Sequence, residues 1–270
     1  MAKGYIAPSV RRIFQILRAV SLSRGGLGIS ELSRDLGMAK STVHGMTSAL
    51  EEMGALVRDS RSKRYTLGYS LIELGMAAYS QVDLKALARP VMEKLMETTH
   101  TTVFLGVLNN EHVTIIDVVE PRSELKITSP VGTTMPLIAG AVGKVLLSRM
   151  EEEQALSLMR KKGLTRYTVN TVTDPEACMR EIRSVREMGY ATDDEEYILG
   201  VRAVASPVLE ESRLVGVLWA VGFKAGLDEE SMKSLVIETR KAAEEINERI
   251  RGRAGNQAKR RGSARRREAE

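Results

Sequence analysis

The sequence predicts an α+β protein in two parts: a small N-terminal domain of helices with one hairpin, and a larger domain of strands and helices. Three observations predict this. The chain has 270 residues, enough for about two domains. Apolar residues recur at helical spacing through residues 10–53. From residue 103 onward, alternating apolar runs are separated by turn residues.

Charge divides the chain into an acidic middle and two basic ends. The net charge is +6 over residues 1–70, −7 over 71–250 and +6 over 251–270, within a total of +5. Basic ends are typical of contact with a polyanion such as nucleic acid. The other interpretation is a solvated surface followed by a disordered tail, and charge alone favours neither.

Several functional classes are excluded by composition. No apolar run approaches the ~18 residues of a membrane span, and MAKGYIAPSVRRIF lacks the hydrophobic core of a signal peptide. We therefore expect a cytoplasmic protein without a membrane partner. The single cysteine, Cys178, excludes an internal disulfide, and three widely separated histidines give no metal-ligand spacing. No metal and no cofactor are expected.

The N-terminal helices predict a helix-turn-helix. SVRRIFQILRAVSLSRGGLG forms a first helix ended by Gly25 and Gly26, and a second helix follows until Gly37 breaks it. The helix KSTVHGMTSALEEMG begins only a few residues later. Two short helices joined by a tight turn place the second in the major groove of DNA, with its N-terminal residues toward the base edges.

The third helix has one apolar stripe and one polar face. The stripe contains Val43, Met46, Thr47, Leu50 and Met53. The candidate DNA contacts are Lys40, Ser41, Thr42, His44, Gly45 and Ser48. Gly45 costs about 1 kcal/mol of helix propensity relative to alanine. Either the backbone approaches the groove closely at this glycine, or the position makes no contact.

A basic hairpin completes a winged helix-turn-helix over residues 9–70. ALVRDSRSKRYTLG reads as a strand, a turn over residues 59–63 and a second strand. The candidate phosphate or minor-groove contacts on this wing are Arg58, Arg61, Lys63 and Arg64. Winged helices also dock proteins, but the basic wing favours double-stranded DNA as the partner.

Two sets of motifs resemble one known family. LSRDLGMAKSTVHGMTSALEEMG followed by RYTLGYSLIELG is similar to the DNA-binding domain of IclR-family bacterial transcriptional regulators. MPLIAGAVGKVLL and YATDDEEYILGVRAVASPVLEESRLVGVL resemble the effector-binding domain of the same family. The resemblance covers residues 9–250 in the family's order. It implies a linker helix over 71–83 that helps to pair subunits, and a GAF-like effector-binding domain over 84–250 with a curved antiparallel sheet.

The second domain begins with an amphipathic helix over residues 84–96, in which Pro90 lies in a first turn or marks a kink. Strands are predicted over 103–120 with a turn at Asn109-Asn110, over ELKITSPVG at 124–132, and in a hairpin over 203–223. Helices are predicted around 137–150, over 175–188 and over 228–251.

No catalytic set is assembled in this sequence. Residues 193–196 form an acidic run that either holds a metal, acts in general acid-base chemistry or is a solvated loop, and no histidine or cysteine lies beside it. Gly140 and Gly143 lack the spacing of a phosphate-binding loop, and Cys178 reads as an inert thiol. We therefore expect no enzymatic activity.

The family resemblance also implies the effector-binding residues. Ala141, Val142 and Gly143 match the backbone at the family's GK pair, and Asp193 matches its acidic ligand contact. Ala203, Trp219 and Val221 stand where a cysteine and two serines are common. These departures predict a more apolar pocket for an aromatic or otherwise hydrophobic effector, with Trp219 stacked on its ring. The alternative is that Trp219 fills the space itself.

The whole chain is thus predicted to be a ligand-responsive regulator that binds a pseudo-palindromic operator as a homodimer or dimer of dimers. The alternative is a metabolite-sensing or enzymatic α+β domain with a docking-only winged helix. Residues 251–270 cannot build a core, so a disordered basic tail is expected. This tail either maintains solubility or adds phosphate contacts.

Overall fold

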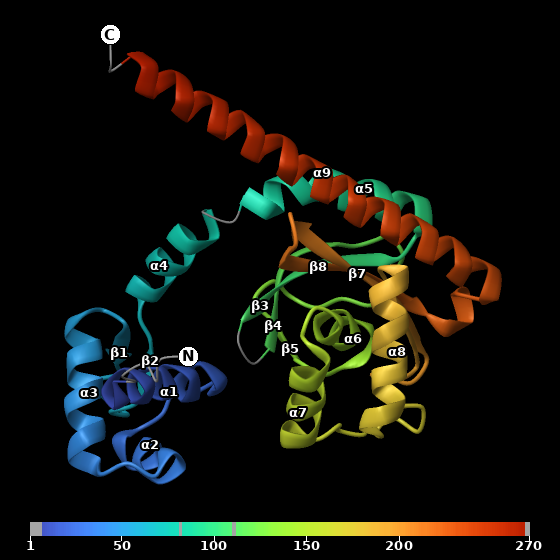
Figure 1. Ribbon diagram of the computed structural model, residues 1–270. Helices are drawn as coiled ribbons and strands as arrows, with labels where there is room; N and C mark the ends of the chain where they lie inside the picture. Colours follow the sequence, from blue (N-terminus) through green and yellow to red (C-terminus); the bar gives the residue numbers. More distant parts are fainter. Residues whose placement is uncertain (1–6, 81–82, 110–111, 268–270) are drawn as a thin grey trace. The chain divides into compact units, whose positions relative to one another are not determined.

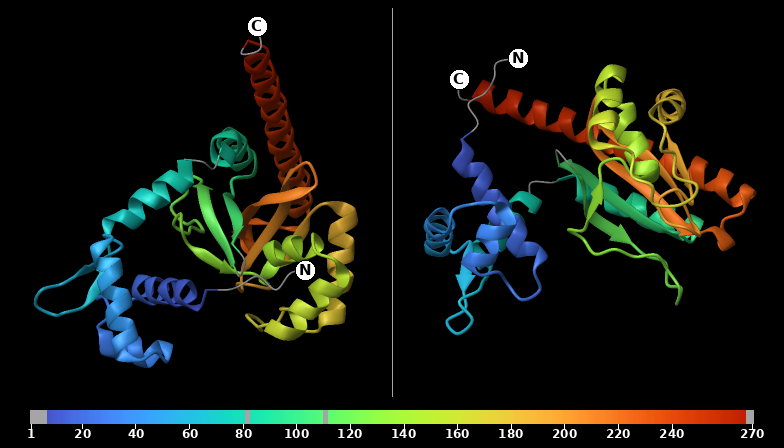
Figure 2. Two further views of the ribbon diagram at one scale, coloured as in Figure 1. Left: turned by 60° about the vertical axis from the view of Figure 1, so that its left-hand side comes forward. Right: turned by 90° about the horizontal axis from the view of Figure 1, so that it is seen from below.

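The computed structural model describes residues 7–80, 83–109 and 112–267. The chain divides into two compact units, Met1–Val82 and Asp83–Glu270, each with its own hydrophobic core. Figure 1 shows the elements of both units, and Figure 2 gives two further views.

The first unit has the predicted order of helices and hairpin, so the helix-turn-helix is confirmed. The hairpin strands pair antiparallel, with Val57 opposite Thr66. The elements are α1 (Pro8–Leu22), α2 (Ile29–Leu36), α3 (Lys40–Glu52), β1 (Leu56–Arg58), β2 (Tyr65–Leu67) and α4 (Tyr69–Ser80).

Local residues fix both ends of α2. The backbone N–H of Gly28 donates to Glu31 Oε2 at 2.8 Å, which anchors the first turn. Gly37 ends the helix at a φ of +62°, a left-handed conformation that glycine adopts without steric cost. The N–H of Met38 then donates to the carbonyl of Ser33 at 3.0 Å. The tight turn before α3 is therefore dictated by sequence.

The core of this unit is closed by α3 and the hairpin. Thr47 belongs to it because its hydroxyl donates to the carbonyl of Val43 at 2.9 Å. Met53, which we placed on the apolar stripe, is 72% exposed. It caps the C-terminus of α3 and lies beyond the core, so that assignment was wrong. The buried apolar residues include Ile16, Val20, Leu32, Val43, Leu50, Leu56 and Tyr65.

The second unit is built on one antiparallel sheet in the order β5-β4-β3-β8-β7-β6. Two hairpins, β3-β4 and β7-β8, meet where β3 pairs with β8. The predicted antiparallel sheet is confirmed. Its strands are β3 (Thr102–Asn109), β4 (His112–Val119), β5 (Thr134–Pro136), β6 (Ala191–Asp194), β7 (Val201–Glu210) and β8 (Arg213–Phe223).

Helices cover both faces of this sheet. On one face lie α5 (Asp83–Thr99) and α9 (Glu229–Arg267). On the other lies α6 (Gly140–Ser148), which packs against α8 (Pro175–Met188). Beside α8 lies α7 (Glu152–Lys162), and η1 (Lys224–Gly226) follows β8 (Figures 1 and 2). The face beneath α6 holds the candidate ligand site.

The third strand lies later than predicted. Residues 124–132 form a loop, and β5 begins at Thr134, where it pairs with β4. The chain turns between these residues and β5, where the N–H of Thr133 donates to the carbonyl of Pro130 at 3.1 Å and Gly132 adopts a φ of +91°. The predicted turn at Asn109-Asn110 lies partly outside the described residues, since β3 ends at Asn109 and β4 begins at His112.

Two helices also differ from expectation. Pro90 lies inside α5 and not in its first turn. The backbone of α9 is helical through Arg267, whereas we expected disorder over residues 251–270. Ala, Arg, Lys and Gln are good helix formers, and extending an existing helix needs no new nucleus. Residues 268–270, and residues 81–82 of the predicted linker helix, lie outside the described part of the chain.

Candidate functional site

The polar face of α3 is open to solvent, as a DNA-reading helix requires. Lys40, Ser41, His44, Gly45 and Ser48 are exposed on it, and Thr42 is half-buried. An ideal Cβ built on Gly45 meets nothing within 4 Å. Packing within the unit therefore does not require a glycine there.

The wing has an ordered turn. Asp59 Oδ1 accepts from the backbone N–H of Ser62 at 2.6 Å and of Arg61 at 3.2 Å, and from the Ser62 hydroxyl at 2.7 Å. Hydrogen bonds from the backbone and hydroxyl of Ser62 lower the pKa of Asp59, so the carboxylate stays ionised. Lys63 adopts a φ of +58° at the end of this turn. Arg61 and Lys63 are thereby presented at the exposed tip of the hairpin.

The other two basic wing residues are engaged inside the unit. Arg64 donates from Nη1 to the carbonyl of Gly26 at 2.7 Å and pairs through Nη2 with Glu31. Arg58 lies over the ring of Tyr65, 5.7 Å from its centroid. Arg64 therefore links the wing to α2 as well as carrying charge, a role that spacing alone did not reveal.

A cavity of about 230 Å³ lies beneath α6 in the second unit. Six of the seven predicted effector residues line it, namely Ala141, Val142, Asp193, Ala203, Trp219 and Val221. Gly143 does not. An ideal Cβ on Gly143 would lie 2.9 Å from the carbonyl carbon of Ile138, so this glycine permits close packing of α6 on the preceding loop.

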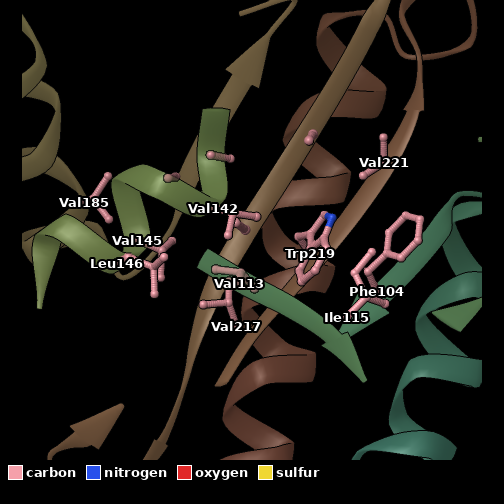
Figure 3. Close-up of a cluster of buried hydrophobic side chains, with 14 of the residues drawn as sticks. Phe104, Val113, Ile115, Val142, Val145, Leu146, Val185, Val217, Trp219 and Val221 are labelled. Carbon is pink, nitrogen blue, oxygen red and sulfur yellow. The ribbon is translucent and has the colours of Figure 1, made fainter. Parts of the chain in front are cut away.

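The apolar wall of the cavity includes two stacked aromatic rings. Phe104 and Trp219 are paired across β3 and β8, with ring centroids 5.3 Å apart and planes 17° apart. Figure 3 shows both rings in one cluster with Val142 of α6. Gly106 leaves room for the indole, because an ideal Cβ there would lie 2.9 Å from Cζ3 of Trp219. Trp219 forms part of the wall, and the cavity remains open beside it.

The opposite wall is polar. Asp193 is 6% exposed, and burial raises the pKa of its carboxyl, an effect only partly offset by the N–H of Glu196 and the ammonium of Lys144. The N-cap of α6, Ala139, makes no side-chain cap, so the first N–H groups of α6 border the cavity without that partner. Among the described residues, no lysine, arginine or histidine lines the cavity.

Much of the lining was missed from the sequence. Thr128, Ser129 and Thr133 lie in the loop before β5, whose residues carry no periodic signal, and Tyr197 and Ile198 follow β6. The missed lining residues include Phe104, Ile115, Thr128, Ser129, Thr133, Thr134, Tyr197 and Ile198. The arrangement suits a small molecule with one flat apolar part and one polar group.

The acidic run does not form a metal site. Asp194 pairs with Arg202 at 2.7 Å, Glu195 with Lys224, and Glu196 with Lys144 at 2.5 Å. Within residues 7–80, 83–109 and 112–267, no cluster of His, Cys, Asp and Glu is arranged to hold a metal ion. Cys178 is buried, and burial raises its pKa to about 11. In the same residues no helix has the length and apolar content needed to cross a membrane.

Comparison with known proteins agrees with this architecture. Residues 9–60 match the IclR helix-turn-helix domain, and residues 76–248 match the family described as bacterial transcriptional regulator IclR C-terminal. The HTH-type transcriptional regulator KdgR of Escherichia coli strain K12 is 32% identical over 240 residues, which cover 88% of this chain and 91% of that protein.

Solved structures have the same fold. An IclR transcriptional regulator from Alicyclobacillus acidocaldarius superposes with a TM-score of 0.77 at 28% identity, covering 91% of this chain and 100% of that one. An IclR homolog from Microbacterium hydrocarbonoxydans, solved in complex with 4-hydroxybenzoate, shares the fold at 24% identity, with a TM-score of 0.73 over 90% of this chain and 99% of that one.

A helix-turn-helix with an exposed polar helix, a basic wing and an α+β domain with a cavity are features of ligand-responsive DNA-binding transcriptional regulators. The chain belongs to the IclR family of bacterial transcriptional regulators. These proteins are regulators and not enzymes, so the enzymatic alternative is wrong.

Proposed function

We propose that the protein binds a pseudo-palindromic operator as a homo-oligomer, and that a small aromatic or hydrophobic effector controls this binding. The exposed polar face of α3, together with the ordered basic wing, is the observation that supports operator binding. Two copies related by a two-fold axis would read half-sites about 34 Å, or a multiple of that distance, apart. Effector binding would shift the population between arrangements that fit and do not fit the operator.

Operator binding is tested with DNA from upstream of the protein's own gene. Full-length protein should retard this fragment specifically. Ser41→Ala or His44→Ala should weaken specific binding by roughly tenfold while leaving nonspecific binding unchanged, since base contacts are worth about 1–3 kcal/mol. Lys40→Ala should weaken binding to all sequences, whereas Lys233→Ala, an exposed lysine of α9, is the matched control and should change nothing. Absence of specific retardation at low salt would contradict the proposal.

Exposed apolar side chains on the first unit support self-association. Val10 and Phe14 lie one helical turn apart on α1, and Ile72 and Leu74 are exposed on α4. Phe14→Glu should shift the mass measured by light scattering toward the monomer. Leu125→Glu, at an exposed leucine of the second unit, should not. An unchanged mass in Phe14→Glu would remove α1 from the proposed interface.

The stacked rings of Phe104 and Trp219 support the proposal that the effector is aromatic or hydrophobic. Trp219 is the chain's one tryptophan, so its fluorescence reports on the cavity. We expect a saturable change with 4-hydroxybenzoate, benzoate or another ring acid, and a weaker one with glyoxylate. A response to glyoxylate without a response to any ring compound would reverse the assignment.

A further inference from the structure

Lys144 is a buried cation that lies outside the cavity lining. Its side chain is held by three groups on other segments of the second unit. Nζ lies 2.5 Å from Glu196 Oε1 and 2.6 Å from Glu181 Oε2, and it donates to the carbonyl of Thr192 at 3.1 Å. A buried ammonium needs such partners to remain charged, so these contacts hold α8 and the segment 192–196 against α6.

One partner of Lys144 belongs to the turn that carries the acidic group of the cavity. The N–H of Glu196 donates to Asp193 Oδ1 at 2.7 Å. Asp193 and Tyr197, on either side of Glu196, both line the cavity. The hydroxyl of Thr171 donates to the backbone carbonyl of Glu196 at 2.6 Å. Lys144 therefore binds the side chain of Glu196, while Thr171 binds its backbone.

The second partner acts elsewhere. Glu181 lies on α8, and its contact with Lys144 joins α8 to α6. Glu181 does not line the cavity, whereas the turn held through Glu196 does. Lys144 therefore has two separable contacts. Its ion pair with Glu181 packs α8 against α6, and its ion pair with Glu196 holds the turn that lines the cavity.

We propose that Lys144 is a positioning residue for effector binding, which sets the place of the Asp193–Tyr197 turn through Glu196 and Thr192 without touching the ligand. This inference rests on the proposed effector site. The proposed role explains why a charged lysine is buried on α6 next to the residues of that helix that line the cavity. Loss of Lys144 would release the turn and leave two carboxylates facing each other near the cavity.

The direct test is hydrogen exchange of the full-length, ligand-free protein. In Lys144→Met, amides of residues 192–197 should exchange faster by about tenfold or more, because the turn opens locally. Lys144→Arg keeps the positive charge and should restore most of the protection. Glu181→Gln keeps the Glu196 contact and should leave the turn protected.

Two results would overturn the proposal. One is unchanged exchange over residues 192–197 in Lys144→Met. The other is an equal acceleration throughout the second unit in both Lys144→Met and Glu181→Gln, since that would make Lys144 a general stabilising residue.

Titration of Trp219 fluorescence with 4-hydroxybenzoate and benzoate then separates this inference from the proposed function. The Kd should rise by about tenfold in Lys144→Met and Glu196→Gln, and stay within about twofold in Glu181→Gln and Lys144→Arg. If the wild-type protein binds neither probe, the aromatic-effector proposal fails, while the exchange result still decides whether Lys144 positions the turn.

Discussion

Gly45 is exposed on α3, where the unit leaves space for a side chain. Gly45→Ala should raise the free energy of unfolding of the first unit by about 1 kcal/mol, because alanine has the higher helix propensity. Denaturant titration measures this change, and Gly25→Ala, at an exposed turn outside the helices where a Cβ meets nothing within 4 Å, is the control.

The affinity of Gly45→Ala for the operator then separates the two interpretations of this glycine. Weaker binding of the more stable variant means that the DNA approaches the backbone closely. Unchanged binding means that position 45 makes no contact. A less stable variant would contradict the helix argument itself.

Gly106 determines where the indole of Trp219 lies. An ideal Cβ there would be 2.6 Å from Val113 Cγ1 and 2.9 Å from Trp219 Cζ3, so Gly106→Ala must move one of these side chains. We expect a loss of about 1–3 kcal/mol in stability and a shifted Trp219 emission. Gly25→Ala, whose Cβ meets nothing within 4 Å, should leave the emission unchanged. An unaltered spectrum in Gly106→Ala would show that the ring is not held there.

Asp193 should make stability fall as pH rises. Burial raises its folded-state pKa above the ordinary 3.8, so the folded protein holds this proton more tightly than the unfolded chain. Its contribution is complete below 3.8 and is lost as pH rises through the folded pKa. In denaturant titrations from about pH 3.8 upward, Asp193→Asn should remove this fall in the free energy of unfolding.

The neighbouring Asp194 provides a control of opposite sign. Its hydrogen bond with Arg202 lowers its pKa, so its contribution is present at higher pH and is lost as pH falls. Asp194→Asn should therefore remove stability at neutral pH. The assignment of Asp193 is refuted if both variants change the curve in the same direction.

At the scale of elements, the sequence predicted what neighbouring residues determine. Gly37 and the apolar spacing of α3 fixed the helix-turn-helix, and Asn109 marked the end of β3. Contacts between residues far apart in the chain could not be predicted, because no local sequence pattern indicates them. Arg64 meets Gly26, 38 positions away, and Lys144 meets Glu196, 52 positions away. Asp193 and Trp219 could be predicted from the sequence as lining residues of the cavity. The threonine and serine residues of the lining could not, because their place depends on the path of the loop before β5.

The basic end of α9 provides a prediction about DNA affinity. Residues 251–270 carry a net charge of +6. If this segment meets phosphates, its deletion should make the slope of log affinity against log salt shallower, because fewer counterions are released. Replacing its Lys and Arg residues by Gln should have the same effect without shortening the chain. A slope that both variants leave unchanged would assign the segment to solubility alone.

At the scale of the whole molecule, the two separate cores predict separable unfolding. Leu32 is fully buried in the first unit and Leu105 in the second. Leu32→Ala should lower the stability of the first unit by about 2–5 kcal/mol and weaken operator binding, while ligand titration of Trp219 is retained. Leu105→Ala should affect the second unit. Calorimetry of the full chain distinguishes this from cooperative unfolding, in which either variant would shift every transition together.

The buried thiol of Cys178 makes the protein suited to site-specific labelling. It is the chain's one cysteine, and a pKa of about 11 keeps it protonated at neutral pH, where maleimide reagents attack thiolates. A dye will therefore react first with a cysteine introduced at an exposed position, as in Met53→Cys at the end of α3. In the proposed homo-oligomer, energy transfer between dyes on two subunits would then follow the spacing of the two α3 helices without first removing Cys178.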